Sequence, residues 1–189
     1  MKGEIQVNSE EKFADEVDEV LISEEKLKKE IKNLGKKITE HYNEDDDIVM
    51  AGILRGAVIF MADLARQIDL PVTFDFMDVS SYGASTKTSG NVRIIKDLEE
   101  NIEDRHVLIV EDIIDTGLTL KHVVNMLKTR GPASINIVTL LDKPDRRIKK
   151  EINADFNGFE IPDKFVVGYG LDYAEKYRNL PYIGVIQES

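Results

Sequence analysis

Apolar positions along the chain follow two patterns. Short, nearly continuous apolar runs alternate with longer segments in which apolar residues recur every three or four positions. The runs predict buried strands at residues 48–53, 71–77, 92–95, 106–110 and 134–141, with late strands at 165–167 and 182–186. The recurring positions predict helices at residues 23–42, 57–68 and 119–130. Strands that alternate with helices in this way predict an α/β fold, in which a central, mostly parallel sheet is flanked by helices.

Composition narrows the class of protein. The chain has 189 residues, of which 42% are hydrophobic and 32% are charged, a mixture typical of one globular domain. It contains no cysteine, which excludes disulfides and thiolate metal sites. The net charge of −11 disfavours nucleic acid as a partner, because an acidic surface repels phosphate backbones. The sequence shows no signal peptide and no membrane-spanning run, so we expect a cytoplasmic protein without a membrane partner.

The carboxyl end of the strand at residues 106–110 carries the strongest candidate chemistry. Two adjacent acids, Glu111 and Asp112, follow the strand, and the loop beyond them consists of Asp115, Thr116, Gly117, Leu118 and Thr119. Glycine lets this loop turn tightly, so its amides can face one point at the positive end of the next helix and hold a phosphate. The paired acids can bind sugar hydroxyls, directly or through hydrated Mg²⁺, and Asp115 stands where it can act as a base.

The complete segment at residues 107–120 indicates a function more specifically than any of its short motifs does. A bare Asp-Thr-Gly is more often a helix cap, whereas residues 107–120 (VLIVEDIIDTGLTL) resemble the phosphoribosyl-diphosphate (PRPP) motif of type I phosphoribosyltransferases. The string is not a Walker loop, because no Gly-Lys-Ser/Thr follows. From about residue 45 to the C-terminus the chain resembles the hypoxanthine-guanine phosphoribosyltransferases. The resemblance implies a single domain over residues 1–189, with a small hood over the active site formed by the N-terminal and C-terminal segments.

The reaction that the resemblance implies is transfer of the phosphoribosyl group of PRPP to hypoxanthine or guanine, with Mg²⁺ as cofactor and release of diphosphate. Glu111 and Asp112 would orient the ribose and the metal, and residues 115–119 would bind the 5′-phosphate. Asp115 would accept the N7 proton of the purine as N9 attacks. Some relatives carry Lys where this chain has Leu118, so one cation is missing from the phosphate site.

Two further segments match the family's diphosphate site and lid. Arg55 and Gly56 fall in the diphosphate-binding loop, where the peptide before Arg55 can be cis in the family, and Arg178 would reach the diphosphate as a charged donor. Ser81 and Tyr82 begin a polar stretch that resembles the mobile lid, which would exclude water during the reaction. Without the resemblance, these residues would indicate only a turn and a surface loop.

The base-binding residues lie near the C-terminal end of the chain. Lys143 corresponds to the lysine that donates to the 6-oxo group of the purine, a contact that disfavours adenine. Phe165 would stack on the base, and the backbone of Val166 would meet its edge. Asp172 would lie near a second metal or the 2-position of the base. The partners implied are therefore PRPP and a 6-oxopurine.

Three other functions remain open at this point. The chain could be an RNA-binding or nucleotide-binding regulator that keeps the fold, although its acidity disfavours RNA. It could be a phosphoribosyltransferase that prefers xanthine or adenine, although Lys143 and Phe165 disfavour adenine. A non-enzymatic nucleotide-binding domain is disfavoured by the combination of Asp115, Arg55 and the polar loop. The ranking of hypoxanthine against guanine also stays open, and analogy with the family predicts a homodimer or homotetramer.

Overall fold

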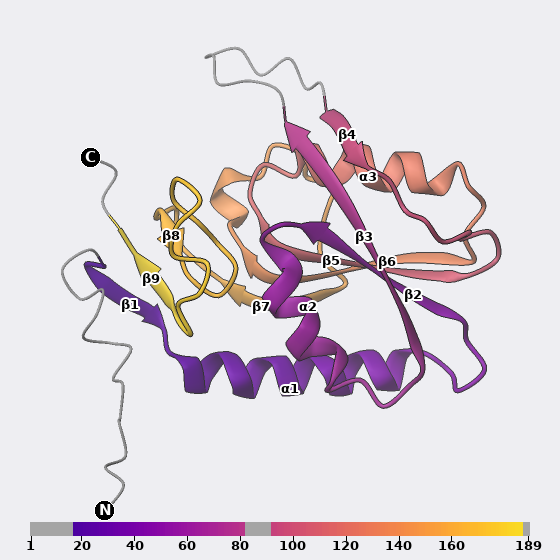
Figure 1. The fold of residues 1–189 in the computed structure, drawn as a ribbon, viewed down its shortest axis with the longest axis horizontal. Helices are drawn as coiled ribbons and strands as arrows, with labels where there is room; N and C mark the ends of the chain where they lie inside the picture. The colour runs from indigo at the N-terminus through magenta and orange to yellow at the C-terminus, as the bar shows by residue number, and fades with distance from the viewer. Residues whose placement is uncertain (1–16, 82–91, 187–189) are drawn as a thin grey trace, which may run out of the picture.

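The computed structural model describes residues 17–81 and 92–186 and confirms the α/β class. Its central sheet contains, in spatial order, β4 (Val92–Lys96), β3 (Val72–Ser81), β2 (Ile48–Leu54), β5 (His106–Ile114), β6 (Ser134–Asp142) and β7 (Phe156–Glu160) (Figure 1). All neighbouring strands are parallel except β4, which is antiparallel to β3. The carboxyl ends of the parallel strands therefore meet at one edge of the sheet.

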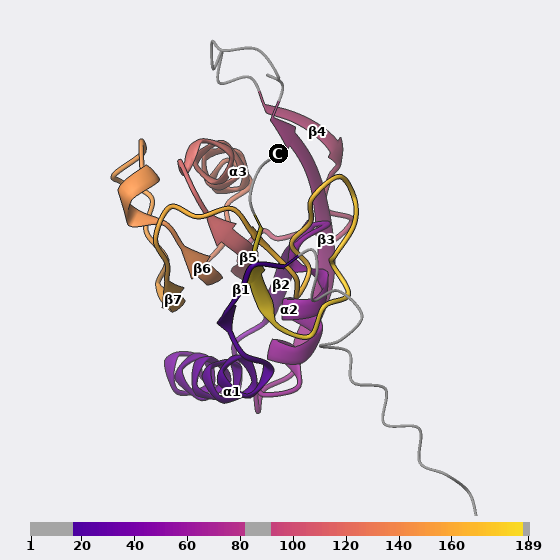
Figure 2. The ribbon, with the colours of Figure 1, turned by 90° about the vertical axis from the view of Figure 1, so that its left-hand side faces the viewer.

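Helices cover both faces of this sheet. α1 (Glu24–His41) and α2 (Ala57–Ala65) lie on one face, and α3 (Leu118–Lys128) lies on the other (Figure 2). The strand β2 needs cover on both faces, because its alternate side chains are apolar. Met50 packs into the core beneath α1 and α2, whereas Val49 and Ala51 pack into the core beneath α3. The Ser23 hydroxyl accepts a hydrogen bond from the Lys26 N–H at 3.4 Å and caps α1. The three predicted helices are thus confirmed, and each end lies within three residues of its prediction.

Four strands differ from their predictions. β3 continues to Ser81, four residues beyond its predicted end and into the residues that were expected to form a loop, and β1 (Glu19–Ile22) was not predicted. β5 continues to Ile114, four residues beyond the predicted end, because it stays in parallel register with β6 as far as Asp142. β7 was not predicted, because only its first residue, Phe156, is buried. An edge strand held mainly by backbone pairing leaves little apolar pattern in the sequence.

A second, smaller sheet stands at the carboxyl ends of the parallel strands (Figure 1). It joins β1 (Glu19–Ile22), β9 (Ile183–Val185) and β8 (Val166–Val167), which are all antiparallel. Segments from the two ends of the described chain therefore pair with each other beside the edge where ligands bind in α/β folds.

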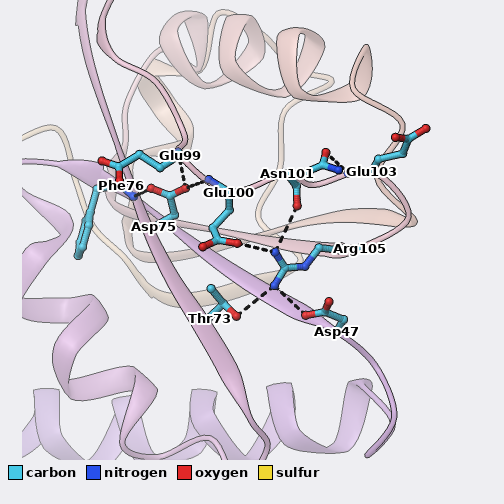
Figure 3. A network of polar contacts seen from close by, with 9 residues as sticks. All are labelled: Asp47, Thr73, Asp75, Phe76, Glu99, Glu100, Asn101, Glu103 and Arg105. Carbon is cyan, nitrogen blue, oxygen red and sulfur yellow. Dashed lines mark hydrogen bonds and ion pairs between the residues drawn. The ribbon is translucent and has the colours of Figure 1, made fainter.

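Buried Asp75 fastens the connection between β4 and β5 to the middle of β3 (Figure 3). Its carboxylate accepts hydrogen bonds from the backbone N–H groups of Phe76 at 2.7 Å, Glu99 at 2.7 Å and Glu100 at 2.8 Å. Burial alone would raise the pKa of Asp75, but these three donors and the Lys96 ammonium at 3.6 Å lower it below its ordinary value. The carboxylate is therefore held in its charged form.

Arg105 joins the amino-terminal ends of three strands in the same network (Figure 3). Its guanidinium donates to Asp47 at 2.8 Å, just before β2, and to the Thr73 hydroxyl at 3.0 Å, near the start of β3. A further bond reaches Glu100 at 2.9 Å. This network aligns the amino-terminal ends of the strands and leaves the opposite edge for the site.

Some predictions fall outside the described residues. Tyr82 and the rest of the expected lid lie there, and Ser81 is the last residue of β3. Among the helices that the structure describes, none is both long and apolar enough to cross a membrane.

Candidate active site

The loop between β5 and α3 forms a small cavity. Gly117 precedes α3 with a φ of 76°, a left-handed conformation that favours glycine. The cavity measures about 100 Å³, and its lining includes Glu111, Asp115, Thr116 and Thr119. Asp115, Thr116 and Thr119 were predicted to bind the 5′-phosphate and Glu111 to orient the ribose and the metal, and the structure brings all four together around one space. Leu118 begins α3, and its amide lies 3.4 Å from the Thr116 hydroxyl.

Arg147, which the sequence reasoning missed, supports this loop from behind. Its guanidinium donates to the backbone carbonyl of Asp115 at 3.2 Å, to the carbonyl of Ile152 and to the carboxylate of Asp142. The Arg147 side chain is only 7% exposed. A Cβ on Gly117 would lie 3.2 Å from its Cδ, a tight contact that adds to the left-handed backbone in favouring glycine here. Nothing in the polar run around Arg147 signals this buried role.

The adjacent acids Glu111 and Asp112 sit at the carboxyl end of β5. Burial raises the pKa of Glu111 well above its ordinary value, and the neighbouring charge of Asp112 adds to the effect. Burial also raises the pKa of Asp112, although hydrogen bonds and the charge of Arg178 oppose that rise. Two carboxylates this close would gain from a cation between or beside them.

Two glycines, Gly56 in the turn after β2 and Gly170 in the loop after β8, allow these segments to approach Asp112. A Cβ on Gly56 would overlap the Asp112 carboxylate, and a Cβ on Gly170 would overlap the Gly56 carbonyl oxygen. The peptide between Leu54 and Arg55 is cis, as the resemblance allowed. Gly170 thus contacts Gly56, and Gly56 contacts Asp112, so the loop after β8, the turn after β2 and the strand β5 meet here.

The predicted diphosphate ligands converge on one loop after β8. Arg178 donates to the Gly170 carbonyl at 2.7 Å and forms an ion pair with Asp172 at 2.7 Å. Arg55 forms an ion pair with Glu175 at 2.8 Å, and Arg178 lies 3.3 Å from the same carboxylate. Glu175 was not among the predicted site residues, because an acid in a polar loop indicates only a solvated surface.

A larger cavity of about 540 Å³ lies between the small sheet and the carboxyl end of β6. Lys143 and Phe165, both predicted purine ligands, line it together with Arg146, Asp163 and Asp18. Val166, the third predicted contact, is buried in β8. The Phe165 ring packs edge-on against Tyr173, with centroids 5.5 Å apart. The cavity is thus lined by both an aromatic ring and a largely buried ammonium.

A chain of charges connects this cavity to the phosphate loop. Lys143 is 8% exposed, and its ammonium lies 3.6 Å from Asp163. Arg146, in the short 3₁₀ helix η1 (Pro144–Arg146), lies 3.4 Å from Asp163 and 2.8 Å from Asp115. The predicted base and the predicted purine donor are therefore linked through Asp163 and Arg146, neither of which was predicted.

The expected metal ligands do not form one cluster. In residues 17–81 and 92–186, no group of three or more His, Asp or Glu side chains is arranged to hold a metal ion. Asp172 pairs with Arg178, while Glu111 and Asp112 stand together on β5. A cation here would be held by one or two carboxylates and completed by other oxygen donors.

Comparison with known proteins decides the family. Residues 17–174 match the family model described as a phosphoribosyl transferase domain. The chain belongs to the phosphoribosyltransferase family. Its relatives within this family include the hypoxanthine-guanine phosphoribosyltransferase of Bacillus subtilis, which is 57% identical over 172 residues, 91% of this chain and 94% of that protein. The resemblance noted in the sequence is therefore confirmed, and the family match begins before residue 45.

Other phosphoribosyltransferases agree in sequence and in structure. The hypoxanthine phosphoribosyltransferase of Haemophilus influenzae is 55% identical over 170 residues, 89% of this chain and 94% of that protein. The crystal structure of a hypoxanthine phosphoribosyltransferase from Staphylococcus aureus superposes with a TM-score of 0.90 at 49% identity and covers 96% of this chain and 97% of its own. The fold described above is thus that of the family.

Proposed function

We propose that this phosphoribosyltransferase acts in purine salvage and transfers the 5-phosphoribosyl group of PRPP to hypoxanthine, guanine or both. The products are the nucleoside 5′-monophosphate and diphosphate. The observation that carries this proposal is the placement of the phosphate cradle, the paired acids and the cavity that holds Lys143 and Phe165 along one edge of the sheet. Relatives above 50% identity that are named for this activity support it.

The proposed chemistry begins with binding of the 5′-phosphate to the amides and hydroxyls of residues 115–119. Bond breaking at the anomeric carbon leaves positive charge on the ribose and negative charge on the departing diphosphate. Arg55 and Arg178 stabilise that diphosphate. Asp115, which lines the cradle, accepts the N7 proton of the purine as N9 attacks.

Mg²⁺ suits the acids of this site. Glu111 and Asp112 offer hard oxygen ligands, and Mg²⁺ is typically bound by one or two carboxylates together with substrate phosphates. A dedicated cage of three or more carboxylates is therefore not required. Bound Mg²⁺ would neutralise charge on the diphosphate. Asp172 would join it only after exchanging its ion pair with Arg178.

Purine recognition follows from the larger cavity. The Lys143 ammonium is a donor and would bond a 6-oxo group but face another donor in adenine. Phe165 supplies the aromatic surface on which the base stacks. We place the small sheet of β1, β9 and β8 as the hood of this pocket, within a single domain. None of the relatives named above suggests an RNA-binding regulator, and a cytoplasmic location stays a prediction.

A steady-state assay tests the function. Purified protein is supplied with PRPP, Mg²⁺ and, separately, hypoxanthine, guanine, xanthine and adenine, and diphosphate release is measured. We expect turnover with hypoxanthine or guanine and little with adenine. Xanthine as the preferred base would replace the proposed specificity, and no turnover with any base would refute the enzyme assignment.

We further propose that the protein forms homodimers or homotetramers. Three apolar side chains are exposed, namely Val58 of α2, Phe74 of β3 and Ile95 of the edge strand β4. Exposed apolar surface of this kind favours contact between copies of the chain. Sedimentation-velocity analysis at several concentrations tests this, and a monomer at all concentrations would exclude it.

A further inference from the structure

Both arginines of the proposed diphosphate site point at a single carboxylate oxygen. The Arg55 Nη1 atom lies 2.8 Å from the Oε2 atom of Glu175, and the Arg178 Nη2 atom lies 3.3 Å from the same Oε2 atom. Carboxylate and phosphate oxygens are equivalent acceptors for a guanidinium group. An oxygen of the bound diphosphate would therefore need the position that Glu175 occupies.

The loop that carries Glu175 has an unusual backbone. Glu175 has a φ of 64°, and Ala174 and Tyr177 also adopt left-handed conformations, with φ of 50° and 72°. Such conformations are uncommon for residues other than glycine. The Glu175 N–H donates to the Asp172 carboxylate at 2.9 Å, which helps to hold the loop. The side chain is thus presented to the arginines by a defined turn.

The exposed fractions of the three side chains indicate which of them can leave its ion pair most easily. The side chains of Arg55 and Glu175 are each 65% exposed, so either can turn into solvent without loss of core packing. Arg178 is 26% exposed and is also held by Asp172 and by the Gly170 carbonyl. Glu175 is therefore the part of this ion-pair cluster that an incoming anion can displace at the lowest cost.

We propose that Glu175 competes with diphosphate for Arg55 and Arg178 and thereby lowers the affinity of the enzyme for diphosphate and PRPP. This inference rests on the proposed function, because it takes both arginines as diphosphate ligands. In the free protein, Glu175 bridges the two guanidinium groups and offsets part of their positive charge. On binding, the diphosphate takes over both contacts, and on product release the Glu175 carboxylate replaces it.

Replacement of Glu175 by an uncharged residue should tighten the binding of diphosphate. Damage to the fold would weaken that binding, so the two effects have opposite signs. Calorimetric titration with magnesium diphosphate would compare the wild type, Glu175→Gln and Glu40→Gln. The control removes one exposed acid of α1, which pairs with Lys36 at 3.6 Å, and so matches the change in net charge. Two ion pairs of this exposure correspond to about two- to thirtyfold tighter binding of magnesium diphosphate in Glu175→Gln.

The outcomes separate the inference from the function on which it rests. Unchanged or weaker binding by Glu175→Gln, or an equal gain in Glu40→Gln, would overturn the inference. A wild type that fails to bind magnesium diphosphate would overturn the diphosphate site itself, and the inference with it. Glu175→Asn is measured in parallel, because Asn tolerates the left-handed backbone and also removes the charge. The constant for product inhibition by diphosphate should fall by the same factor.

Discussion

Arg147 offers a way to separate the stability of the fold from the position of the phosphate loop. Its guanidinium is 7% exposed and pairs with Asp142, which is 14% exposed. Arg147→Met would leave the Asp142 carboxylate buried without its cation, a change that costs about 3–5 kcal/mol. For a chain of this size, that loss corresponds to a fall in Tm of roughly 6–20 °C. The measurement is urea and thermal unfolding followed by circular dichroism.

The double variant Arg147→Met, Asp142→Leu supplies the decisive comparison. Removal of both charges leaves no buried ion, so most of the lost stability should return. The Asp115 and Ile152 carbonyls would still lack the donor that holds the loop. We therefore expect KM for PRPP to stay raised by about tenfold, which corresponds to about 1.5 kcal/mol for one charge-assisted hydrogen bond.

An exposed arginine of α2's carboxyl end serves as the control for Arg147. Arg66→Met removes an exposed arginine that pairs with Asp63, and it should change stability by about 0.5 kcal/mol or less. A loss below about 1 kcal/mol in Arg147→Met would show that the ion pair contributes little. A double variant that regains wild-type KM would show that Arg147 does not position the loop.

Three further predictions concern the site and the sheet. Asp115→Asn should lower kcat in steady-state assays with a modest change in KM for PRPP, and full activity would contradict its role as the base. Asp75→Ala removes the acceptor of three backbone N–H groups and should cost about 2–4 kcal/mol in urea unfolding at pH 7. Folding lowers the pKa of Asp75, so its contribution to stability is present above the ordinary carboxyl pKa of about 4 and is lost as pH falls through the lower folded value. The difference in unfolding free energy between wild type and Asp75→Ala should therefore shrink in acid. A difference that stays constant with pH would refute this origin. Gly170→Ala would place a Cβ on the Gly56 carbonyl at a φ of 104°, and it should raise KM for PRPP, whereas unchanged kinetics would show that this contact is dispensable.

The sequence was informative where a feature depends on neighbouring residues. The alternation of apolar strands and amphipathic helices is a local pattern, so it predicted the layers and most element boundaries. It failed at β7, whose Gly158 packs against the Leu140 carbonyl and whose stability comes from pairing with β6. Backbone pairing of this kind is decided by a strand that lies elsewhere in the chain.

The same distinction holds for the candidate site. The string from Val107 to Leu120 contains its acids, its turn and its helix start in one continuous segment, so the sequence alone determined the reaction class. Only the tertiary structure decided that Arg147 is buried behind that loop and that Arg146 joins Asp115 to Asp163. It likewise placed Glu175 between the two arginines. The physical reason is that connections distant in sequence converge at the carboxyl edge of a parallel sheet, where contact and burial depend on the whole fold.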